Sequence, residues 1–323
     1  MIIRLGYVAN PITFDHLFTY GKTISFTNFS KLEASLAYKK RNQIINSNLN
    51  TLKMVLKFNL ENEIFFYRIT HNLIPLATHK ELDSSYFSLY KETFLSIGKF
   101  IKDHKMRIDA HPDEFCVLNS VKEEVVEQSI RTLLFHQNLF KALDIPGLII
   151  LHIGSATLGK EAGINKFKEV FKTLNPDLQK MIILENDDKI YTVSDTLKLC
   201  EELKIPMVLD YHHYLCNKNN EKIEKYLLRI CKTWDNSPFN PKMHFSSSKS
   251  KKEKRAHSTY LNFKDFLKFI AKIKDLPYDI DIMLECKGKE EGLFRLARQL
   301  SFFSTFKKIN NSTFLIEKKQ RLN

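Results

Sequence analysis

The sequence predicts a closed barrel of eight parallel strands alternating with helices, a (β/α)8 or TIM barrel, and three observations support this prediction. Eight short apolar runs recur along the chain, and the polar segments between them have the periodicity of helices. The runs are continuously rather than alternately hydrophobic, which is typical of parallel strands covered by helices. Most of them end in His, Asp or Glu, at the strand ends where the active sites of such barrels lie.

The predicted strands are spaced so that a helix fits between each pair. They are IIRLGYVA (2–9), FFYRIT (65–70), MRIDAH (106–111), GLIILHI (147–153), MIILEN (181–186), PMVLDYH (206–212), PKMHFS (241–246) and DIDIMLE (279–285). The 323 residues could form two domains, but barrels of about 250 residues or more routinely form one. We therefore expect a single barrel domain over residues 1–305 and a basic tail over 306–323.

The segments between the strands carry an apolar stripe near the helical period. The first, SKLEASLAYKKRNQIINSNLNTLKMVLKFN, starts with Ser30 and has Glu33 three residues later, which predicts a capping box. Further helices are predicted in YFSLYKETFLSIGKFIKDH, VKEEVVEQSIRTLLFHQNLFKAL, INKFKEVFKTL, VSDTLKLCEELK, EKIEKYLLRICKTW and FKDFLKFIAKIKDL.

Cysteine usage and hydropathy indicate an intracellular protein. The five cysteines are odd in number and form no C-x-x-C pair, so neither a disulfide framework nor a thiolate zinc site is indicated. The N-terminus lacks the apolar core of a signal peptide, and no apolar stretch approaches the ~20 residues needed to span a bilayer. We expect a cytoplasmic protein that does not enter a membrane.

The net charge of +13 favours a polyanionic partner, although a lysine-rich genome could also produce it. A basic loop, SSSKSKKEKRAHS (246–258), follows the seventh predicted strand and lies between His244 and His257. Such a loop beside a metal site suits phosphodiester binding. The C-terminal KKQR (318–321) has no such neighbours and is interpreted as a solvated tail. The basic residues of the loop are Lys249, Lys251, Lys252, Lys254 and Arg255.

The residues at the strand ends form a candidate metal-ligand set. Neighbouring side chains in a strand point to opposite sides, so His212 and His213 cannot both face the barrel axis. We prefer His213, because Asp210-x-x-His213 runs past the strand end into the loop, where this alternation is relaxed. Glu185 is preferred over Asp187, which we expect to cap the following turn. Mixed imidazole and carboxylate ligation suits zinc or manganese, and clustered metals are the usual means of cleaving phosphate esters. His16, His71, His104 and His136 are expected to be structural or exposed, and His79 is intermediate. The full set is His111, His152, Glu185, Asp187, Asp210, His212, His213, His244, His257 and Glu285.

These motifs resemble those of the UV damage endonucleases, relatives of the barrel-fold abasic-site endonucleases and of sugar isomerases. The resemblance covers roughly residues 1–300 and is carried by RLGYVAN (4–10), HPDEFCVLN (111–119), LHIGS (151–155), LENDD (184–188), LDYHH (209–213), KMHFSS (242–247), RAHS (255–258) and MLECKGKE (283–290). It implies a (β/α)8 barrel with a trinuclear metal site, commonly manganese, with zinc or cobalt as alternatives. It also implies nicking of DNA on the 5′ side of ultraviolet photoproducts, which leaves a 3′-hydroxyl.

The resemblance also implies a role for each candidate residue. His111 and His152 would hold one metal together with Glu185, which bridges to a second metal held by Asp210, His244 and Glu285. His213 and His257 would hold a third, and His79 occupies the position of a further site histidine. Lys242 lies where family members carry a carboxylated lysine, and an ordinary lysine contacting phosphate is the alternative. Glu114 and Phe115 match residues that probe the duplex, and Tyr7 and Asn10 match residues that border the lesion pocket.

Glu114 departs from the amide found in some family members, which bears on the range of lesions rather than on the chemistry. The expected partner is double-stranded DNA with UV lesions, bound by a monomer that needs no obligate protein partner and works at the nucleoid. Two other functions remain open. A metal-dependent sugar isomerase or epimerase on the same fold would not need the basic loop, and a non-catalytic nucleic-acid-binding barrel would not need the ligand set.

Overall fold

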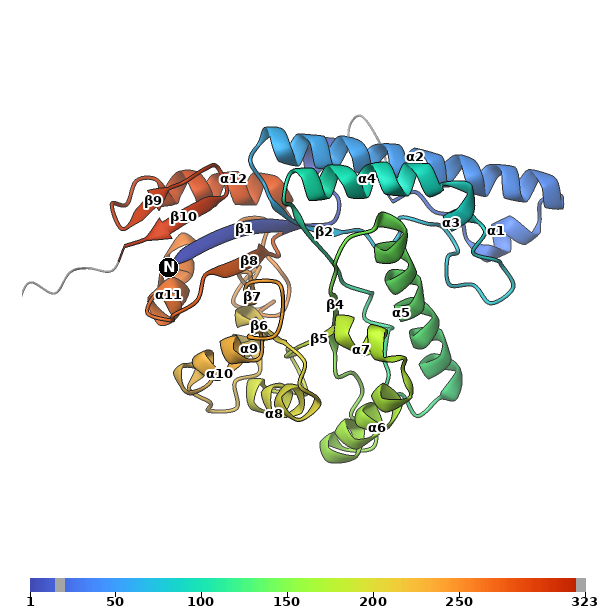
Figure 1. Ribbon diagram of the computed structural model, residues 1–323. Helices are drawn as coiled ribbons and strands as arrows, with labels where there is room; N and C mark the ends of the chain where they lie inside the picture. The colour runs from blue at the N-terminus through green and yellow to red at the C-terminus, as the bar shows by residue number, and fades with distance from the viewer. Residues whose placement is uncertain (15–20, 318–323) are drawn as a thin grey trace, which may run out of the picture.

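A computed structural model of the protein describes residues 1–14 and 21–317. Eight parallel strands form a closed barrel because β1 pairs with both β8 and β2 (Figure 1). The strands are β1 (Ile2–Val8), β2 (Phe66–Ile69), β3 (Arg107–Ala110), β4 (Ile149–His152), β5 (Ile182–Glu185), β6 (Met207–Asp210), β7 (Lys242–Phe245) and β8 (Ile280–Leu284). The predicted (β/α)8 barrel is confirmed, and each predicted strand contains an observed one.

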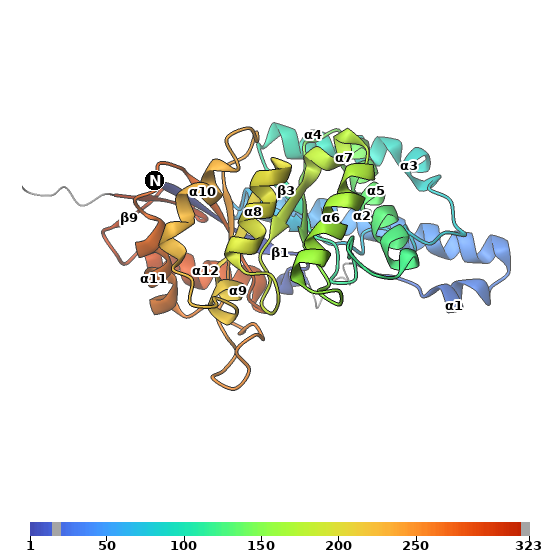
Figure 2. The same ribbon diagram turned by 90° about the horizontal axis from the view of Figure 1, so that it is seen from below.

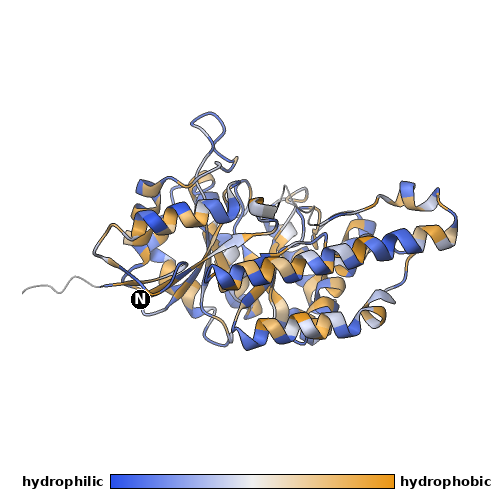
Figure 3. Ribbon diagram, turned by 90° about the horizontal axis from the view of Figure 1, so that it is seen from above, coloured by the Kyte–Doolittle hydropathy of each residue, from blue (hydrophilic) through white to orange (hydrophobic). Residues whose placement is uncertain are grey.

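Helices surround the barrel and bury their apolar faces against the outside of the strands (Figures 1 and 2). Figure 3 shows hydrophilic and hydrophobic residues alternating along these helices, as the sequence periodicity predicts. Their bounds are α1 (Phe26–Ser30), α2 (Ala34–Glu61), α3 (Tyr86–Leu89), α4 (Lys91–Asp103), α5 (Glu123–Leu143), α6 (Lys160–Thr173), α7 (Pro176–Met181), α8 (Val193–Leu203), α9 (Tyr211–Cys216), α10 (Leu227–Lys232), α11 (Phe263–Ile273) and α12 (Lys289–Leu300), with 3-10 turns η1 (Ile12–Phe14) and η2 (Ile223–Lys225).

The predicted capping box at Ser30 is wrong. Ser30 is the last residue of the short helix α1, and α2 begins four residues later with Glu33 as its N-cap. The Glu33 carboxylate accepts hydrogen bonds from the backbone N–H groups of Ser35 and Leu36. The acidic residue therefore satisfies the free N–H groups of the first turn by itself.

Part of the predicted tail is folded. Residues from 306 onward form two further strands, β9 (Phe306–Lys308) and β10 (Thr313–Ile316), and β10 pairs antiparallel with the first residues of β1. Phe314 is fully buried in this extension of the sheet, which gives the segment a reason to fold. The KKQR segment (318–321) and His16 lie outside the described residues.

The barrel interior carries charged groups where most such barrels carry aliphatic side chains. Asp281 of β8 forms ion pairs with Arg4 and Arg107, and Asp109 of β3 forms ion pairs with Arg107 and Lys242. Because an unpaired buried charge is costly, both carboxylates of this layer have basic partners. The layer links four strands below the barrel mouth, where the candidate ligands lie.

Candidate metal centre

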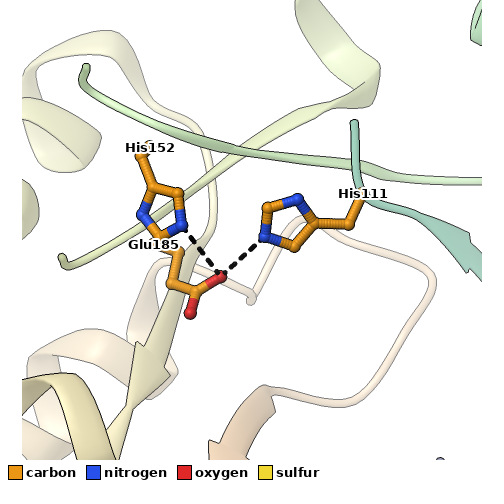
Figure 4. A group of neighbouring side chains, drawn as sticks. All are labelled: His111, His152 and Glu185. Atoms are coloured by element: carbon orange, nitrogen blue, oxygen red, sulfur yellow. Dashed lines mark hydrogen bonds and ion pairs between the residues drawn. The ribbon is translucent and has the colours of Figure 1, made fainter. Parts of the chain in front are cut away.

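Glu185, at the end of β5, lies at the centre of the candidate site. One of its carboxylate oxygens lies 3.2 Å from Nε2 of His111 and 4.0 Å from Nε2 of His152 (Figure 4). Its other oxygen lies 3.1 Å from Nδ1 of His244 and 3.3 Å from Nδ1 of His213. One carboxylate thus faces four imidazoles that come from four different strand ends, as the strand-end pattern in the sequence predicts.

Three groups of side chains bring candidate ligand atoms within 4.8 Å of one another. Glu185 belongs to both the first and the second group, and Asp210 belongs to both the second and the third. Shared carboxylates allow neighbouring ions to be bridged. The groups are His111, His152 and Glu185; Glu185, Asp210 and His213; and Asp210, His244 and Glu285.

Several polar atoms of this cluster are buried without a hydrogen bond from the residues that the structure describes. They are Oε1 of Glu185, Oδ2 of Asp210, Nδ1 of His152 and both ring nitrogens of His244. Buried polar groups are normally hydrogen-bonded, so a concentration of such atoms at one place indicates a binding site. Imidazole nitrogens and carboxylate oxygens are the donors that zinc and manganese accept. The residues present therefore fit divalent metal ions.

The charges of the cluster also favour a cation. Burial opposes ionisation of Glu185, but the facing imidazoles, His244 above all, outweigh it and hold the pKa of Glu185 well below its ordinary value. Burial also acts against a charged His213, yet Asp210 and Glu185 raise its pKa to about 11. Burial lowers the pKa of His111 to about 4, which keeps its imidazole neutral, the form that binds metal. The carboxylates thus attract positive charge to a point that a divalent ion can occupy.

A short helix determines which of two adjacent histidines joins the cluster. Asp210 caps α9 by accepting a hydrogen bond of 2.7 Å from the backbone N–H of His213, and this turn directs His213 toward Glu185. His212 is buried outside the three groups, with Nε2 3.2 Å from the carbonyl oxygen of Arg255. The preference for His213 therefore agrees with the geometry. Asp187 accepts hydrogen bonds from the backbone of residues 189–191, as expected of a turn cap.

Two histidines at the edge of the predicted set behave differently. The ring of His257 lies 6.4 Å from that of His213, so the basic loop carries His257 back to the rim of the cluster. His79 stacks on Phe26 with ring centroids 3.7 Å apart and belongs to none of the three groups. The assignment of His79 as a metal ligand is not supported, because the loop after β2 directs it toward α1 instead.

Lys242 lies two residues before His244 on β7 and is fully buried below the ligands. Its Nζ lies 3.0 Å from Oδ2 of Asp109 and 5.1 Å from the centre of the Phe66 ring. Burial is the main reason that the pKa of Lys242 falls to about 8, although Asp109 opposes the shift.

The residues predicted to read the lesion are divided between surface and core. Glu114 and Phe115 lie on the loop after β3, and 75% of Phe115 is exposed. Asn10 follows β1 and is partly exposed. Tyr7, by contrast, is fully buried, and its hydroxyl donates a hydrogen bond of 2.7 Å to Oδ1 of Asn59 in α2. This orientation, from β1 toward α2, does not support the prediction that Tyr7 borders a lesion pocket.

The basic loop (246–258) projects from the barrel mouth as a narrow hairpin, drawn in orange in Figure 2. Ser248 and His257 form an antiparallel bridge at its base, and the Lys249 N–H donates a 2.7 Å hydrogen bond to the Ala256 carbonyl. Lys249 forms an ion pair with Glu253, and Arg255 lies 3.4 Å from Asp188. Among the described residues, the other three basic side chains have no ion-pair partner. These unpaired lysines are Lys251, Lys252 and Lys254.

A cavity of about 290 Å³ adjoins the cluster between the loops that follow β3, β4 and β5. His111 and His152 are among the residues that line it, together with Glu114 and Asp188. Its volume is near the lower end for small-molecule pockets.

One basic residue of the site was not predicted from the sequence. Arg68 of β2 forms an ion pair with the candidate ligand Glu285, through Nη1 and Oε1. The available signal was a charged residue inside the otherwise apolar strand FFYRIT. Strand alternation then places Arg68 on the same inner side as Phe66.

Fold and site together define the protein as a (β/α)8-barrel enzyme with a candidate metal centre at the C-terminal strand ends. The family model described as UV-endonuclease UvdE matches residues 3–316, and the chain belongs to this family. The UV DNA damage endonuclease of Bacillus thuringiensis subsp. konkukian (strain 97-27) is 36% identical over 315 residues, which cover 97% of this chain and 99% of the relative. That of Bacillus mycoides (strain KBAB4) is 35% identical over 315 residues, with the same coverage.

Solved structures agree with the fold. The crystal structure of SacUVDE superposes with a TM-score of 0.83 at 33% identity, covering 93% of this chain and 98% of that one. Endonuclease IV from Thermus thermophilus gives a TM-score of 0.51 at 13% identity and covers 93% of this chain and 100% of its own. The 3-keto-D-glucoside 4-epimerase of E. coli gives 0.51 at 10% identity, covering 88% and 92%. The last two share the fold alone. Among the described residues, no helix is both long enough and apolar enough to cross a bilayer.

Proposed function

We propose that the protein is a metal-dependent DNA repair endonuclease. It hydrolyses the phosphodiester 5′ to UV photoproducts, both cyclobutane pyrimidine dimers and (6-4) products, and leaves a 3′-hydroxyl. The observation that carries the proposal is the position of Glu185, which faces four imidazoles at the barrel mouth. The UV DNA damage endonucleases to which the chain is similar supply the substrate class.

Three divalent ions, Mn²⁺ first and Zn²⁺ or Co²⁺ as alternatives, would be held by the ligand groups described above. When bound, such ions generate hydroxide at neutral pH and neutralise the leaving oxygen. Glu185 would hold the first two ions together, and Asp210 would also orient His213 through their hydrogen bond of 2.7 Å. His257, whose ring lies 6.4 Å from that of His213, would hold an ion together with His213 from the base of the basic loop. This position couples the loop to the ligand set.

Lys242 would assist from below the ligands. Its Nζ is fully buried in the barrel and cannot reach a DNA phosphate. Burial therefore argues against a direct phosphate contact. The form that we propose is carboxylated, in which the neutral amine of Lys242 adds carbon dioxide and releases a proton. Asp109, 3.0 Å from Nζ, holds the side chain in place before carboxylation.

Lesion recognition would depend on the loop after β3. Phe115 is exposed and free to fill the gap left when a damaged dinucleotide leaves the stack, and Glu114 beside it would accept a hydrogen bond from a base donor such as cytosine N4. Asn10 would border the lesion from the end of β1. The basic loop would contact phosphates without reading sequence, since Lys and Arg contacts to the backbone position a duplex rather than specify it.

The alternative, a sugar isomerase or epimerase, accounts for fewer of these features. A neutral sugar gives no role to the three unpaired lysines or to an aromatic side chain that is 75% exposed. We further propose that the protein acts on chromosomal DNA in the cytoplasm as a monomer without an obligate protein partner.

The test is to map the cleavage of an end-labelled duplex that contains one cyclobutane dimer. The expected product is a single nick 5′ to the dimer whose 3′-hydroxyl is extended by a DNA polymerase. Glu185→Gln should abolish the nick and retain binding, because a neutral amide cannot balance two ions. Glu169→Gln, which removes an exposed carboxylate of α6 away from the ligands and the basic loop, is the matched control and should nick normally. Nicking by Glu185→Gln at the wild-type rate would remove this residue from the reaction.

A further inference from the structure

An arginine approaches the ring of candidate ligands from β2. Arg68 is the third residue of that strand, and its guanidinium forms an ion pair with Oε1 of Glu285. The same oxygen lies 3.4 Å from Nδ1 of His244, so Arg68 approaches the ligand group built on β6, β7 and β8. Only 17% of the Arg68 side chain is exposed, so the cation is largely enclosed.

Arg68 occupies a part of the rim that lacks candidate ligands. Among the described residues, neither β1 nor β2 contributes a member of the three ligand groups. On its other side lies β3, where Asp109 is the register partner of Arg68 and His111 follows the strand end. The residue therefore lies between the ligands of β3 and those of β8. A substrate seated on the cluster would meet Arg68 through the 17% of its side chain that is exposed.

The charge of the cluster does not require an arginine once metal is present. The three shared ligand groups contain three carboxylates, from Glu185, Asp210 and Glu285. Two divalent ions already exceed that negative charge, and Arg68 adds to the excess by competing for Glu285. An anionic substrate would balance the excess. Arginine is suited to this role, because its planar fork donates to two oxygens of a phosphate, and no second ion pair of Arg68 exists among the described residues.

We propose that Arg68 is a catalytic residue that donates hydrogen bonds to a non-bridging oxygen of the scissile phosphodiester. The inference depends on the proposed endonuclease function. In that reaction the oxygen of water bonds to phosphorus, the P–O3′ bond breaks, and O3′ takes up the proton that water loses. The products are a 3′-hydroxyl and a 5′-phosphate. Arg68 stabilises the negative charge that grows on the phosphoryl oxygens. Glu285 would hold a metal ion while it keeps its ion pair with Arg68.

A double-mutant cycle between the arginine and the phosphate charge tests this contact. The duplex carries one cyclobutane dimer and either a phosphodiester or a neutral methylphosphonate at the scissile position. Dissociation constants are measured with the Mn²⁺-loaded protein for wild type, Arg68→Met and Arg68→Lys, with the phosphodiester complexes read before cleavage. The neutral linkage should lower the affinity of wild type for the duplex about 10-fold more than it lowers the affinity of Arg68→Met. This is the size expected of one hydrogen bond to a charged group. Arg68→Lys, which keeps the charge, should restore part of this difference.

The control variant is Arg4→Met, which removes the arginine paired with Asp281 near the other end of the barrel. It should show the wild-type sensitivity to the neutral linkage. Metal content, measured by mass spectrometry, should be the same in wild type and both Arg68 variants. The inference is overturned if Arg68→Met responds to the neutral linkage as wild type does, or if both Arg68 variants lose metal, since the residue would then only support Glu285. A wild-type protein that fails to nick the unmodified duplex would instead refute the proposed function.

Discussion

Replacement of Phe115 by Ala separates the reading of a lesion from the chemistry of the site. The side chain is 75% exposed, so only about a quarter of it contributes to the core. Full burial of a Phe stabilises a protein by roughly 1.5–3 kcal/mol, and the truncation should therefore cost less than ~1 kcal/mol of folding free energy. Stacking of one base on an aromatic ring contributes ~1–3 kcal/mol. We expect a loss of about 5- to 150-fold in affinity for a duplex with a photodimer.

The assay is a pair of binding curves, with damaged and undamaged duplex, for wild type and Phe115→Ala at one salt concentration. Undamaged duplex keeps its bases stacked and offers no gap, so its affinity should change little. Metal content should be unchanged, because Phe115 supplies no ligand. Phe302→Ala is the matched control, since Phe302 is 81% exposed beyond the end of α12, outside the lesion-reading loop. Equal losses on both duplexes would refute the role of Phe115 as a wedge.

Three further predictions address other parts of the structure. Replacing the three unpaired lysines of the basic loop by Ser should weaken binding to damaged and undamaged duplex alike. The slope of log affinity against log salt concentration should fall by up to about 3, and an unchanged slope would mean that the loop does not touch DNA. Tyr7→Phe should lower the free energy of unfolding by about 1–2 kcal/mol in urea titrations and leave lesion discrimination intact, and a specific loss of discrimination would return Tyr7 to the lesion pocket. Burial lowers the pKa of His136 to about 4, so below pH 6.5 the unfolded chain binds a proton that the folded protein does not. The free energy of unfolding of the metal-free protein should therefore fall by about 2 kcal/mol between pH 7 and pH 5 because of this residue. His136→Gln should show a correspondingly smaller pH dependence of unfolding, and an identical dependence would contradict the assignment.

The strands were predictable because parallel strands buried on both faces have a simple signature, and MIILEN or PMVLDYH admits few other structures. The same regularity made the ligands predictable, since a His or carboxylate that follows such a strand lies at the barrel mouth. Features set by tertiary packing were not predictable. Ser30 and Glu33 satisfy the sequence rule for a capping box, but the chain places a separate helix before Glu33.

Side-chain direction was not predictable either. Tyr7 lies on β1 and His79 on the loop after β2, yet one points to α2 and the other stacks on Phe26. Arg68 was missed because its partner is distant in sequence. A charge in a predicted strand has no assigned partner until the barrel closes and brings Glu285 beside it. The hairpin at 306–316 was missed because its strands are short and gain stability only from pairing with β1.

The most direct test of the metal-dependent endonuclease function measures nicking as a function of bound metal. Protein stripped with a chelator is titrated with Mn²⁺, and ion content and cleavage of a duplex with one cyclobutane dimer are followed together. We predict no cleavage without metal, and a single nick 5′ to the dimer that rises as the strand-end ligands fill. Cleavage that persists at full rate in the chelator, or full metal binding without any nick, would contradict this function.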